Sequence, residues 1–474
     1  MSERIHQITN EMLEETVDIP EELINSTAKI LNYADISKED AFMFKINLEK
    51  FRMLADKSLV DKDALKIRDA ISSTFFDIYS SVLKKVSVEN NPSRLYQMFL
   101  KYAYIDEKLL EPNQTRVLYE MVAKPNTQAQ CSFYNLKDWL EKIFSKEEEP
   151  SVNEFGLDYY EVFREKKKRG EFLDKDKHGY DNNADARLSH EINNLFNIGQ
   201  KLCCGQMSRY FPILHSGMIS NDLSKALVTS EMIEESLNRI LQVDFSAFHR
   251  EIVCNMPEKG IKKELIMKSV LPDLILMPIF GSRAVMWQEL TGRVKSSPGR
   301  FILPIFTDED LDNLMIEVIA RFRWDLSKNM FSYIRNDGNQ SSLTADYSNY
   351  LQFYRKNGDL SNDAKEKIKT QIAKYRNNVR EIFASDYYTW INYESQGIVR
   401  LNKVVREIFF KYCPFSKTIR ADLEKHPLYN QYIIQYEKWR IKHHKVIQAH
   451  YSQLVKPNVP LDAELEGNLA FYNM

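Results

Sequence analysis

Two neighbouring segments of the sequence contain the kinds of residue that hold anions. Gly281-Ser282-Arg283 and Ser296-Ser297-Pro298-Gly299-Arg300 combine hydroxyls, guanidiniums and glycines. Backbone N–H groups, Ser hydroxyls and Arg side chains are the donors from which phosphate-binding loops are built. A phosphate-bearing ligand bound here would contact Ser282, Arg283, Arg293, Ser297 and Arg300.

The order of residues in these two segments matches no established phosphate loop. Neither the Walker pattern of glycines and lysine nor a GxGxxG pattern occurs in them. Arginines that tie loops to helix ends are the alternative interpretation. We prefer this alternative, because the residue types are present without the spacing that a phosphate loop needs.

The polar stretch Asp174–Asp185 has some features of a calcium-binding loop. Oxygen donors stand at its positions 1, 3, 9 and 12, and Gly179 stands at position 6. However, His178 occupies position 5, where an oxygen ligand is needed, and Asp185 is shorter than the usual bidentate Glu. We therefore interpret the stretch as a solvated loop between helices.

The histidines fall short of a metal site. His190-Glu191 begins like the zinc-protease signature, but Asn194 stands where the second histidine belongs. His443 and His450 lie about 10 Å apart along a predicted helix, and His444 points about 100° away from His443. One straight helix cannot bring these three rings to one ion, so the sequence predicts neither a metal nor a cofactor.

The charges of the chain balance. Its 474 residues include 65 Lys and Arg and 67 Asp and Glu, with a formal net charge of −2, so no overall field favours nucleic acid or an anionic membrane. Two stretches, Lys365–Arg380 and Lys438–Lys445, are locally basic, and Tyr436 and Trp439 accompany the second. Nucleic acid is one ligand for such stretches. We prefer solvated helix faces, which commonly carry basic residues.

The cysteines and the hydropathy of the sequence favour a cytoplasmic location. The five cysteines are scattered and form no CxxC pair, which suits a reducing compartment. The polar N-terminus lacks a signal-peptide pattern. The most apolar run, Leu271–Phe280, is far shorter than the about 20 residues that span a bilayer. We expect a cytoplasmic protein without a membrane span.

Apolar residues recur at the three-and-four spacing of amphipathic helices along most of the chain. This spacing predicts a mostly α, multi-helical fold whose apolar stripes face inward. Residues 257–304 differ, because they are dense in glycine and proline, and we expect an irregular central hub there. Within it, Pro278–Phe280 and Pro304–Phe306 repeat one motif and are the candidates for short strands. Convincing alternating strand patterns are absent elsewhere.

The predicted helices have these approximate limits: Ala64–Val82, Leu95–Tyr102, Leu188–Phe196, Ser230–Ile252, Leu311–Phe322, Ser361–Gly397 with a bend near Ser385-Asp386, Leu401–Phe409 and Tyr429–Leu454, the last followed by a polar tail. An acidic run closed by Pro150 predicts a domain boundary. We expect an N-terminal helical domain at 1–148, a middle helical segment at 152–256 and a C-terminal helical domain at 257–474.

Parts of the C-terminal half resemble bacterial proteins described as cyclic-nucleotide-binding. The likeness lies in Gly281-Ser282-Arg283, Trp287-Gln288-Glu289, Arg300–Phe306 and Gln352–Asn357. The nucleotide-binding cassette of that class, with its β-roll and its Arg-bearing turn, has no counterpart in this sequence. The resemblance therefore implies an associated regulatory region and assigns no functional residues.

These patterns favour a cytoplasmic helical scaffold or regulatory protein that acts through protein–protein interaction. The 5 Trp, 25 Tyr and 26 Phe suit both large cores and aromatic interaction faces. We identify no catalytic residues, so an enzyme is less expected. The alternative is an enzyme or sensor that binds a phosphate-bearing ligand at the hub. The sequence does not indicate the oligomeric state.

Overall fold

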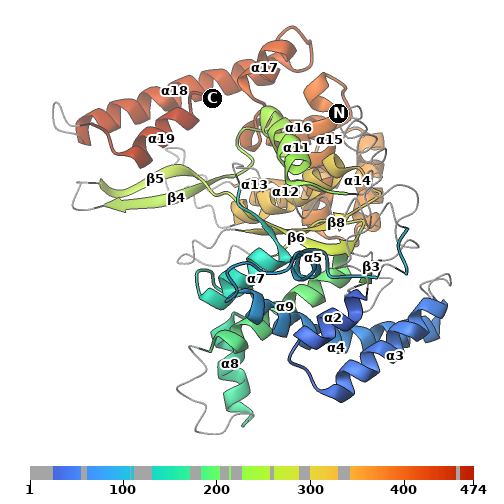
Figure 1. Ribbon diagram of the computed structural model, residues 1–474. Helices are drawn as coiled ribbons and strands as arrows, with labels where there is room; N and C mark the ends of the chain where they lie inside the picture. Colours follow the sequence, from blue (N-terminus) through green and yellow to red (C-terminus); the bar gives the residue numbers. More distant parts are fainter. Residues whose placement is uncertain are drawn as a thin grey trace, which may run out of the picture. The chain divides into compact units, whose positions relative to one another are not determined.

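The structure, a computed structural model, is mostly helical (Figure 1). It describes residues 25–54, 61–106, 108–111, 131–170, 183–202, 213–214, 227–256, 261–287, 299–328, 342–454 and 460–474. Among these residues 63% are helical, in 16 α-helices, which confirms the predicted helical character. The same residues also form one four-stranded and two two-stranded sheets, so the fold is not purely α.

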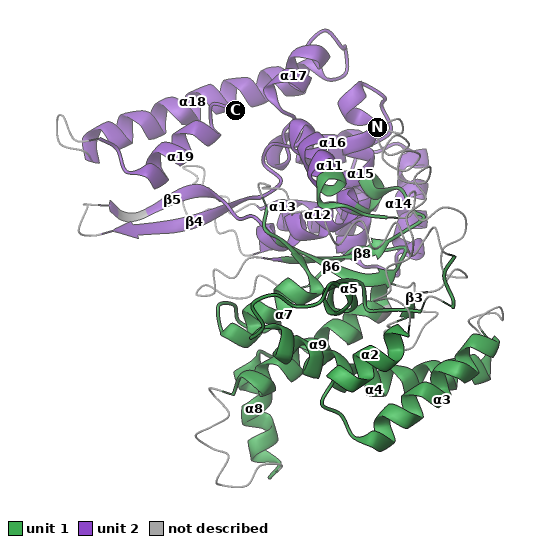
Figure 2. Cartoon of the chain, viewed as in Figure 1, with its two compact units in different colours: residues 1–233, 273–288, 300–314 green, residues 234–272, 289–299, 315–474 purple. Residues whose placement is uncertain are grey.

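The chain divides into two compact units (Figure 2). Unit 1 comprises residues 1–233, 273–288 and 300–314, and unit 2 comprises residues 234–272, 289–299 and 315–474. Each unit is therefore assembled from three separate stretches of chain. The domain limits at 148, 152 and 257 stay predictions.

A mixed sheet with the strand order β2-β6-β8-β7 forms the centre of unit 1. β6 (Asp273–Phe280) and β8 (Arg300–Phe306) run parallel and are buried along almost their whole length. β2 (Phe133–Asn135) pairs in parallel with β6, and β7 (Val285–Met286) pairs antiparallel with β8. Strands that are covered on both faces have continuous apolar sequences. This burial explains why the two Pro-Ile-Phe motifs lie within apolar runs. Both motifs form strands, as predicted, and the structure adds that the two strands are neighbours in the sheet.

Helices cover this sheet within unit 1. α5, α7 and α9 pack against β6 and share one apolar core with it. A further two-stranded parallel sheet joins β1 (Tyr104–Ile105) and β3 (Ile213–Leu214). The helices of unit 1 are α2 (Ser26–Tyr33), α3 (Lys38–Leu54), α4 (Lys62–Val86), α5 (Arg94–Tyr102), α7 (Leu136–Ser145), α8 (Tyr159–Lys168) and α9 (Ala184–Leu202).

Unit 2 is a helical unit with an aromatic core and one β-hairpin. The Phe409 ring has four aromatic neighbours, Tyr347, Phe383, Tyr387 and Trp390, at centroid distances of 6.3, 5.4, 6.4 and 5.4 Å. Its elements are most of α11 (Ser230–Val243), β4 (His249–Met256), β5 (Ile261–Ser269), most of α12 (Leu311–Lys328), α13 (Leu343–Phe353), η5 (Tyr354–Lys356), α14 (Asn362–Lys374), α15 (Val379–Asn392), η6 (Glu394–Gln396), α16 (Lys403–Tyr412), α17 (Lys417–Leu423), α18 (Asn430–Leu454) and α19 (Ala463–Phe471).

The prediction of an irregular hub at 257–304 was wrong. Its described residues form β5, β6, β7 and the first part of β8. Two of its glycines are needed for close packing, because a Cβ at Gly281 would lie 2.8 Å from the Leu202 carbonyl oxygen and one at Gly299 would lie 2.2 Å from the Phe322 ring. Glycine density here marks tightly packed strands and their ends, not an absence of regular structure.

Two helix limits also differ from the prediction. The helix expected over Ser230–Ile252 ends at Val243, since the Asp244 carboxylate accepts from the Ser246 N–H at 3.0 Å in a turn that leads into β4. The hairpin of β4 and β5 was missed, because the alternation of apolar residues in these strands is weak.

The long helix expected over Ser361–Gly397 is two helices, α14 and α15. The break lies at Arg376 and Asn377, whose φ angles of 50° and 61° are left-handed, and not near Ser385-Asp386. Asn tolerates this conformation and favours helix ends. The polar tail was also misread, because it contains α19, which Asp462 caps by accepting from the Glu464 N–H.

Candidate functional site

The predicted anion ligands do not come together in the part of the chain that the structure describes. Arg293 and Ser297 lie outside that part. Arg300 begins β8, whereas the N–H of Gly281, next to Ser282, donates to Phe306 O at the other end of the strand. Ser282 and Arg300 are therefore about 20 Å apart at 3.3 Å per residue, and one anion cannot contact both.

Arg300 is an interior residue. Its Nη1 donates to Ser151 Oγ at 2.6 Å, its Nη2 donates to Glu149 O at 2.7 Å, and its guanidinium lies 4.4 Å from the centroid of the Trp139 ring. Only 1% of Arg300 is exposed. The guanidinium thus fastens the segment 149–151 to β8. Arg283, by contrast, is exposed.

A buried polar cluster continues from Arg300 to Glu191 on α9. Glu191 accepts three hydrogen bonds, from Trp139 Nε1 at 2.7 Å, Ser151 N at 2.6 Å and Ser151 Oγ at 2.8 Å. Ser151 therefore bridges a buried carboxylate and a buried guanidinium. Charges buried in this way are held by their hydrogen bonds, and removal of either partner leaves the other without compensation. Glu191, which belongs to the stretch that begins like a zinc signature, therefore has a structural role.

Asp273 lies opposite Arg300 in the pairing of β6 with β8. Burial raises the pKa of this carboxyl to about 6, although the positive charge of Arg300 lowers it. Desolvation disfavours the ionised form, and the nearby guanidinium offsets only part of this effect.

Metal ligands do not gather among the described residues. No three His, Cys, Asp or Glu side chains there could hold one ion. His443 stacks on Trp439, His444 Nε2 contacts Asn473 Nδ2 at 3.1 Å, and His450 Nε2 contacts Glu264 Oε1 at 2.9 Å. Most of the calcium-like stretch 174–185 lies outside the described residues, and its last residue, Asp185, pairs with Lys84 at 2.7 Å.

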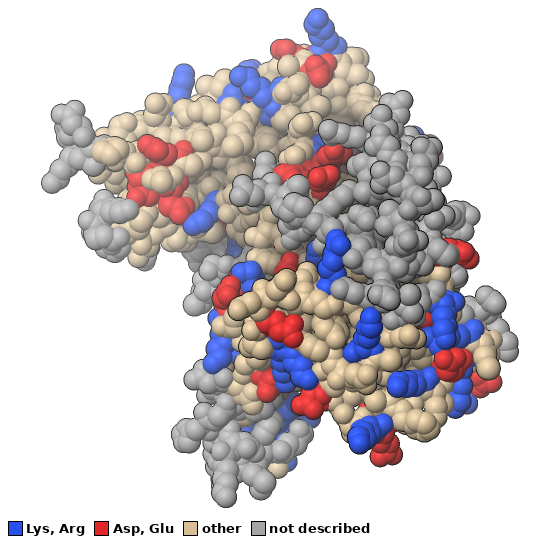
Figure 3. Space-filling view, in the orientation of Figure 1, with Lys and Arg blue, Asp and Glu red and all other residues tan. Residues whose placement is uncertain are grey.

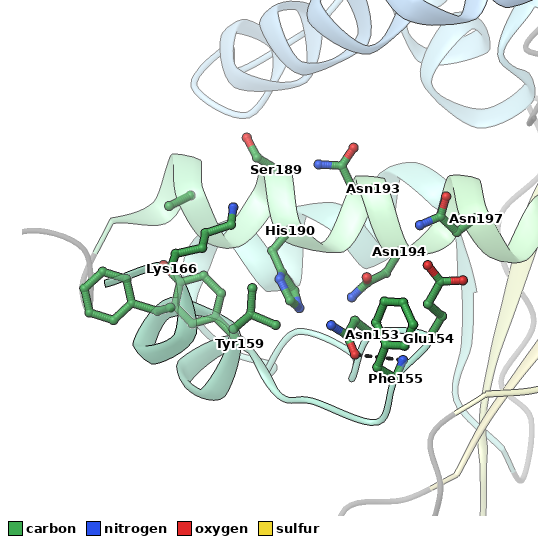
Figure 4. A pocket seen from close by; sticks show the side chains of 13 residues that line it. Asn153, Glu154, Phe155, Tyr159, Lys166, Ser189, His190, Asn193, Asn194 and Asn197 are labelled. Carbon is green, nitrogen blue, oxygen red and sulfur yellow. Dashed lines mark hydrogen bonds between the residues drawn. The ribbon is translucent and has the colours of Figure 1, made fainter. Parts of the chain in front are cut away.

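A pocket of about 250 Å³ lies beside the buried cluster, between the segment 153–155, α8 and α9 (Figure 4). His190 and Asn194 contribute to its wall and both contact the carbonyl oxygen of Ser151, at 3.1 and 2.9 Å. The sequence did not predict this pocket, because its residues come from elements that only the tertiary fold brings together. The asparagine-rich run around Asn193-Asn194 was its one signal.

α18 presents an open surface that is both apolar and basic. Its buried residues are Tyr432, Ile433, Tyr436 and Tyr451. On its remaining sides four large apolar residues are between 38% and 56% exposed, among exposed lysines. We call this surface the α18 face and define it by Ile434, Lys438, Trp439, Ile441, Lys442, Lys445 and Val446.

The α18 face carries positive charge without local compensation. None of Lys438, Lys442 and Lys445 has an ion-pair partner among the described residues. The one carboxylate of the helix, Glu437, pairs with Arg420 and Arg440, each at 2.7 Å. Figure 3 shows scattered basic side chains over α18, a group of acidic ones over α19 and β5, and further acidic ones near α17.

One comparison with known proteins gives a match. The model of a family described as a domain of unknown function, DUF8509, matches residues 332–472, a stretch that includes all of α18 and less than a third of the chain. Neither the curated proteins nor the solved structures contain a match. Among the described residues, no helix combines the length and the apolar character needed to cross a membrane.

Proposed function

We propose that this protein is a regulatory or scaffold protein of the bacterial cytoplasm and that the α18 face binds an acidic, amphipathic segment of a partner protein. The observation that carries the proposal is the combination of four exposed apolar side chains with three unpaired lysines on one helix. Apolar side chains gain free energy when a partner covers them. Unpaired charges steer and select a partner of the opposite sign.

The apolar part of the face favours a protein over nucleic acid. Ile434, Ile441 and Val446 offer nothing to a phosphate backbone, whereas an amphipathic helix would bury them. Lys438 and Lys445, the outermost of the three lysines, are seven residues apart, about 10 Å along the helix. Three cations over that distance are fewer than the six to ten phosphate contacts typical of proteins that depend on DNA binding.

The size of the face suits a transient interaction. α18 has 25 residues and is about 37 Å long, a length that one docked helix can match. Interfaces of this size fall at or below about 1,200 Å² of total buried surface, the range of weak and signalling complexes. A regulatory contact that forms and dissociates agrees with this range better than a permanent one.

One further observation supports a cytoplasmic location. The described cysteines Cys131, Cys254 and Cys413 are buried and are not joined in disulfides, as expected in a reducing compartment. A bacterial origin and a link to cyclic-nucleotide-dependent regulation depend on the sequence resemblance alone. The alternative, a phosphate-bearing ligand at the hub, depends on Arg283 as its one remaining arginine among the described residues, because Arg300 is engaged inside unit 1.

Site-specific photo-crosslinking tests the proposal. Ile441→p-benzoylphenylalanine places a crosslinker on the α18 face, and the same substitution at Lys367, an exposed position of α14, is the matched control. We expect one discrete protein adduct at position 441 and none at position 367. Peptide mapping should locate the crosslink in a segment rich in Asp and Glu.

The identified partner then permits a direct affinity measurement. Lys438→Glu, Lys442→Glu and Lys445→Glu together should weaken its binding at least tenfold, and acidic-to-basic substitutions in the partner should restore it. A nucleic-acid adduct at position 441, or an affinity unchanged by the triple substitution, would contradict the proposal.

A further inference from the structure

We propose that the pocket between the segment 153–155, α8 and α9 binds a small zwitterion with an apolar body, of the amino-acid or short-peptide class. The pocket belongs to unit 1 and is independent of the α18 face. Its volume of about 250 Å³ is slightly below the range of about 300–1,000 Å³ that holds drug-sized ligands, so its ligand must be small.

A rigid turn forms one side of the pocket. Asn153 Oδ1 accepts from the Phe155 N–H at 3.0 Å and from the Leu157 N–H at 2.9 Å, and Asn153 N donates to Leu157 O at 2.8 Å. Gly156 supplies the left-handed φ of 79° that the turn needs. This turn holds the ring of Phe155 79% exposed. Because Phe155 also lines the pocket, its ring offers apolar surface to a ligand bound there.

α9 contributes hydrogen-bond acceptors. Figure 4 shows His190 and Asn194 pointing toward the turn and α8, whereas Ser189, Asn193 and Asn197 point to the other side. A carbonyl oxygen only accepts, so His190 Nε2 must donate to Ser151 O, as Asn194 Nδ2 does.

The remaining polar atoms of these two side chains therefore accept. Burial lowers the pKa of His190, which keeps the ring neutral and leaves Nδ1 with a lone pair. Asn194 Oδ1 is likewise left as an acceptor. Two neighbouring acceptors suit the N–H groups of an ammonium.

Opposite charges mark the two ends of the pocket. Lys166 of α8 is half-buried, and Glu154 of the turn is exposed; neither has an ion-pair partner among the described residues. Figure 4 shows Lys166 at one end of the row of lining side chains and Glu154 at the other. A ligand with a carboxylate and an ammonium can pair with both. Tyr159 and Phe163, which are buried and line the pocket, provide apolar contact for the part between.

Isothermal titration calorimetry with the full-length protein tests this inference. The probes are the twenty free amino acids and the dipeptide Gly-Phe, with N-acetylphenylalanine amide as the uncharged counterpart. We expect at least one zwitterion to bind and the uncharged compound to bind at least tenfold more weakly, because charge-assisted hydrogen bonds discriminate by this factor or more.

Substitutions locate the binding. Lys166→Gln and Glu154→Gln should each weaken the zwitterion at least tenfold, while Lys167→Gln, on an exposed neighbour outside the pocket, should leave its affinity unchanged. Phe155→Ala removes only an exposed ring and should weaken binding without loss of folding. The inference is overturned if no zwitterion of the panel binds, if the uncharged compound binds equally well, or if Lys167→Gln weakens binding as much as Lys166→Gln.

Discussion

Positive charge is used in opposite ways in the two units. In unit 1, Arg300 is buried and its guanidinium is occupied by Ser151, the Glu149 carbonyl group and the Trp139 ring. In unit 2, the three lysines of the α18 face are exposed and unpaired among the described residues, next to apolar side chains that are also uncovered. The Arg300 guanidinium is thus held inside unit 1 by two hydrogen bonds, whereas the α18 lysines make no ion pair among the described residues.

This difference shows why residue type alone misleads. Arg is the best side chain for a phosphate, and Arg300 stands in a glycine- and serine-containing segment, yet Nη1 and Nη2 of this buried side chain donate to Ser151 and Glu149 of the protein itself. A charged residue becomes a candidate for binding when its neighbours leave it without a partner. By that criterion the α18 lysines and the pair Lys166 and Glu154 rank above Arg300.

Removal of the buried charge of Arg300 is expected to have the largest effect on stability. Arg300→Ala deletes two hydrogen bonds and leaves Glu191 buried without its bridged counter-charge, so we expect the free energy of unfolding to fall by about 3 kcal/mol. Arg283→Ala, on an exposed side chain, should change it by less than about 0.5 kcal/mol. Urea denaturation of both variants measures these changes. Equal losses of free energy of unfolding in the two variants would show that Arg300 contributes no more to the fold than the exposed Arg283.

The buried carboxyl of Asp273 should make the free energy of unfolding depend on pH. Its folded pKa of about 6 exceeds its ordinary value of 3.8, so between pH 4 and 6 the folded state binds more protons than the unfolded chain. Stability contributed by this group is therefore lost as the pH rises through that window. Asp273→Asn should be about 2 kcal/mol more stable than the wild type at pH 7 and equally stable at pH 4.

Urea midpoints of the wild type and of Asp273→Asn, measured from pH 4 to pH 7, check this prediction. Parallel curves for the two proteins would show that Asp273 does not titrate abnormally in the folded state.

The α18 lysines should behave differently from Arg300. The triple substitution of Lys438, Lys442 and Lys445 by Glu should change the free energy of unfolding by less than about 0.5 kcal/mol for each site, because exposed charges contribute little to folding. Thermal denaturation provides the measurement. A loss comparable to that of Arg300→Ala would mean that these lysines serve the fold and not a partner.

The smallest effect is expected at the hub. If a phosphate-bearing ligand binds there, Arg283→Ala should abolish any rise in melting temperature that inorganic phosphate or ATP causes in the wild type. Thermal-shift assays of the wild type and of Arg283→Ala, each with and without the ligand, test this prediction. Absence of any shift in the wild type would remove the hub from consideration.

Helical periodicity could be read from the sequence, and the pairing of distant strands could not. The stripes in α4 and α12 predicted real helices because a core-facing helix repeats its apolar residues over many turns. β4 was misread because its alternation is weak, and the break at Arg376 and Asn377 was missed because neither Gly nor Pro marks it.

The candidate sites show the same limit. Ser282 and Arg300 are close in sequence, but the parallel direction of β6 and β8 separates them. Lys166 and Glu154 become two ends of one pocket only after α8 folds beside α9 and the turn forms. Local patterns identify residues that could bind, whereas the tertiary fold decides which of them remain available.

The most direct test is the affinity of the crosslinked partner, once purified, for the wild type and for the triple lysine-to-glutamate variant at two salt concentrations. We predict that the wild type binds the partner less tightly as salt increases and that the variant binds it at least tenfold more weakly than the wild type. Equal affinities of the two proteins, with no effect of salt, would contradict it.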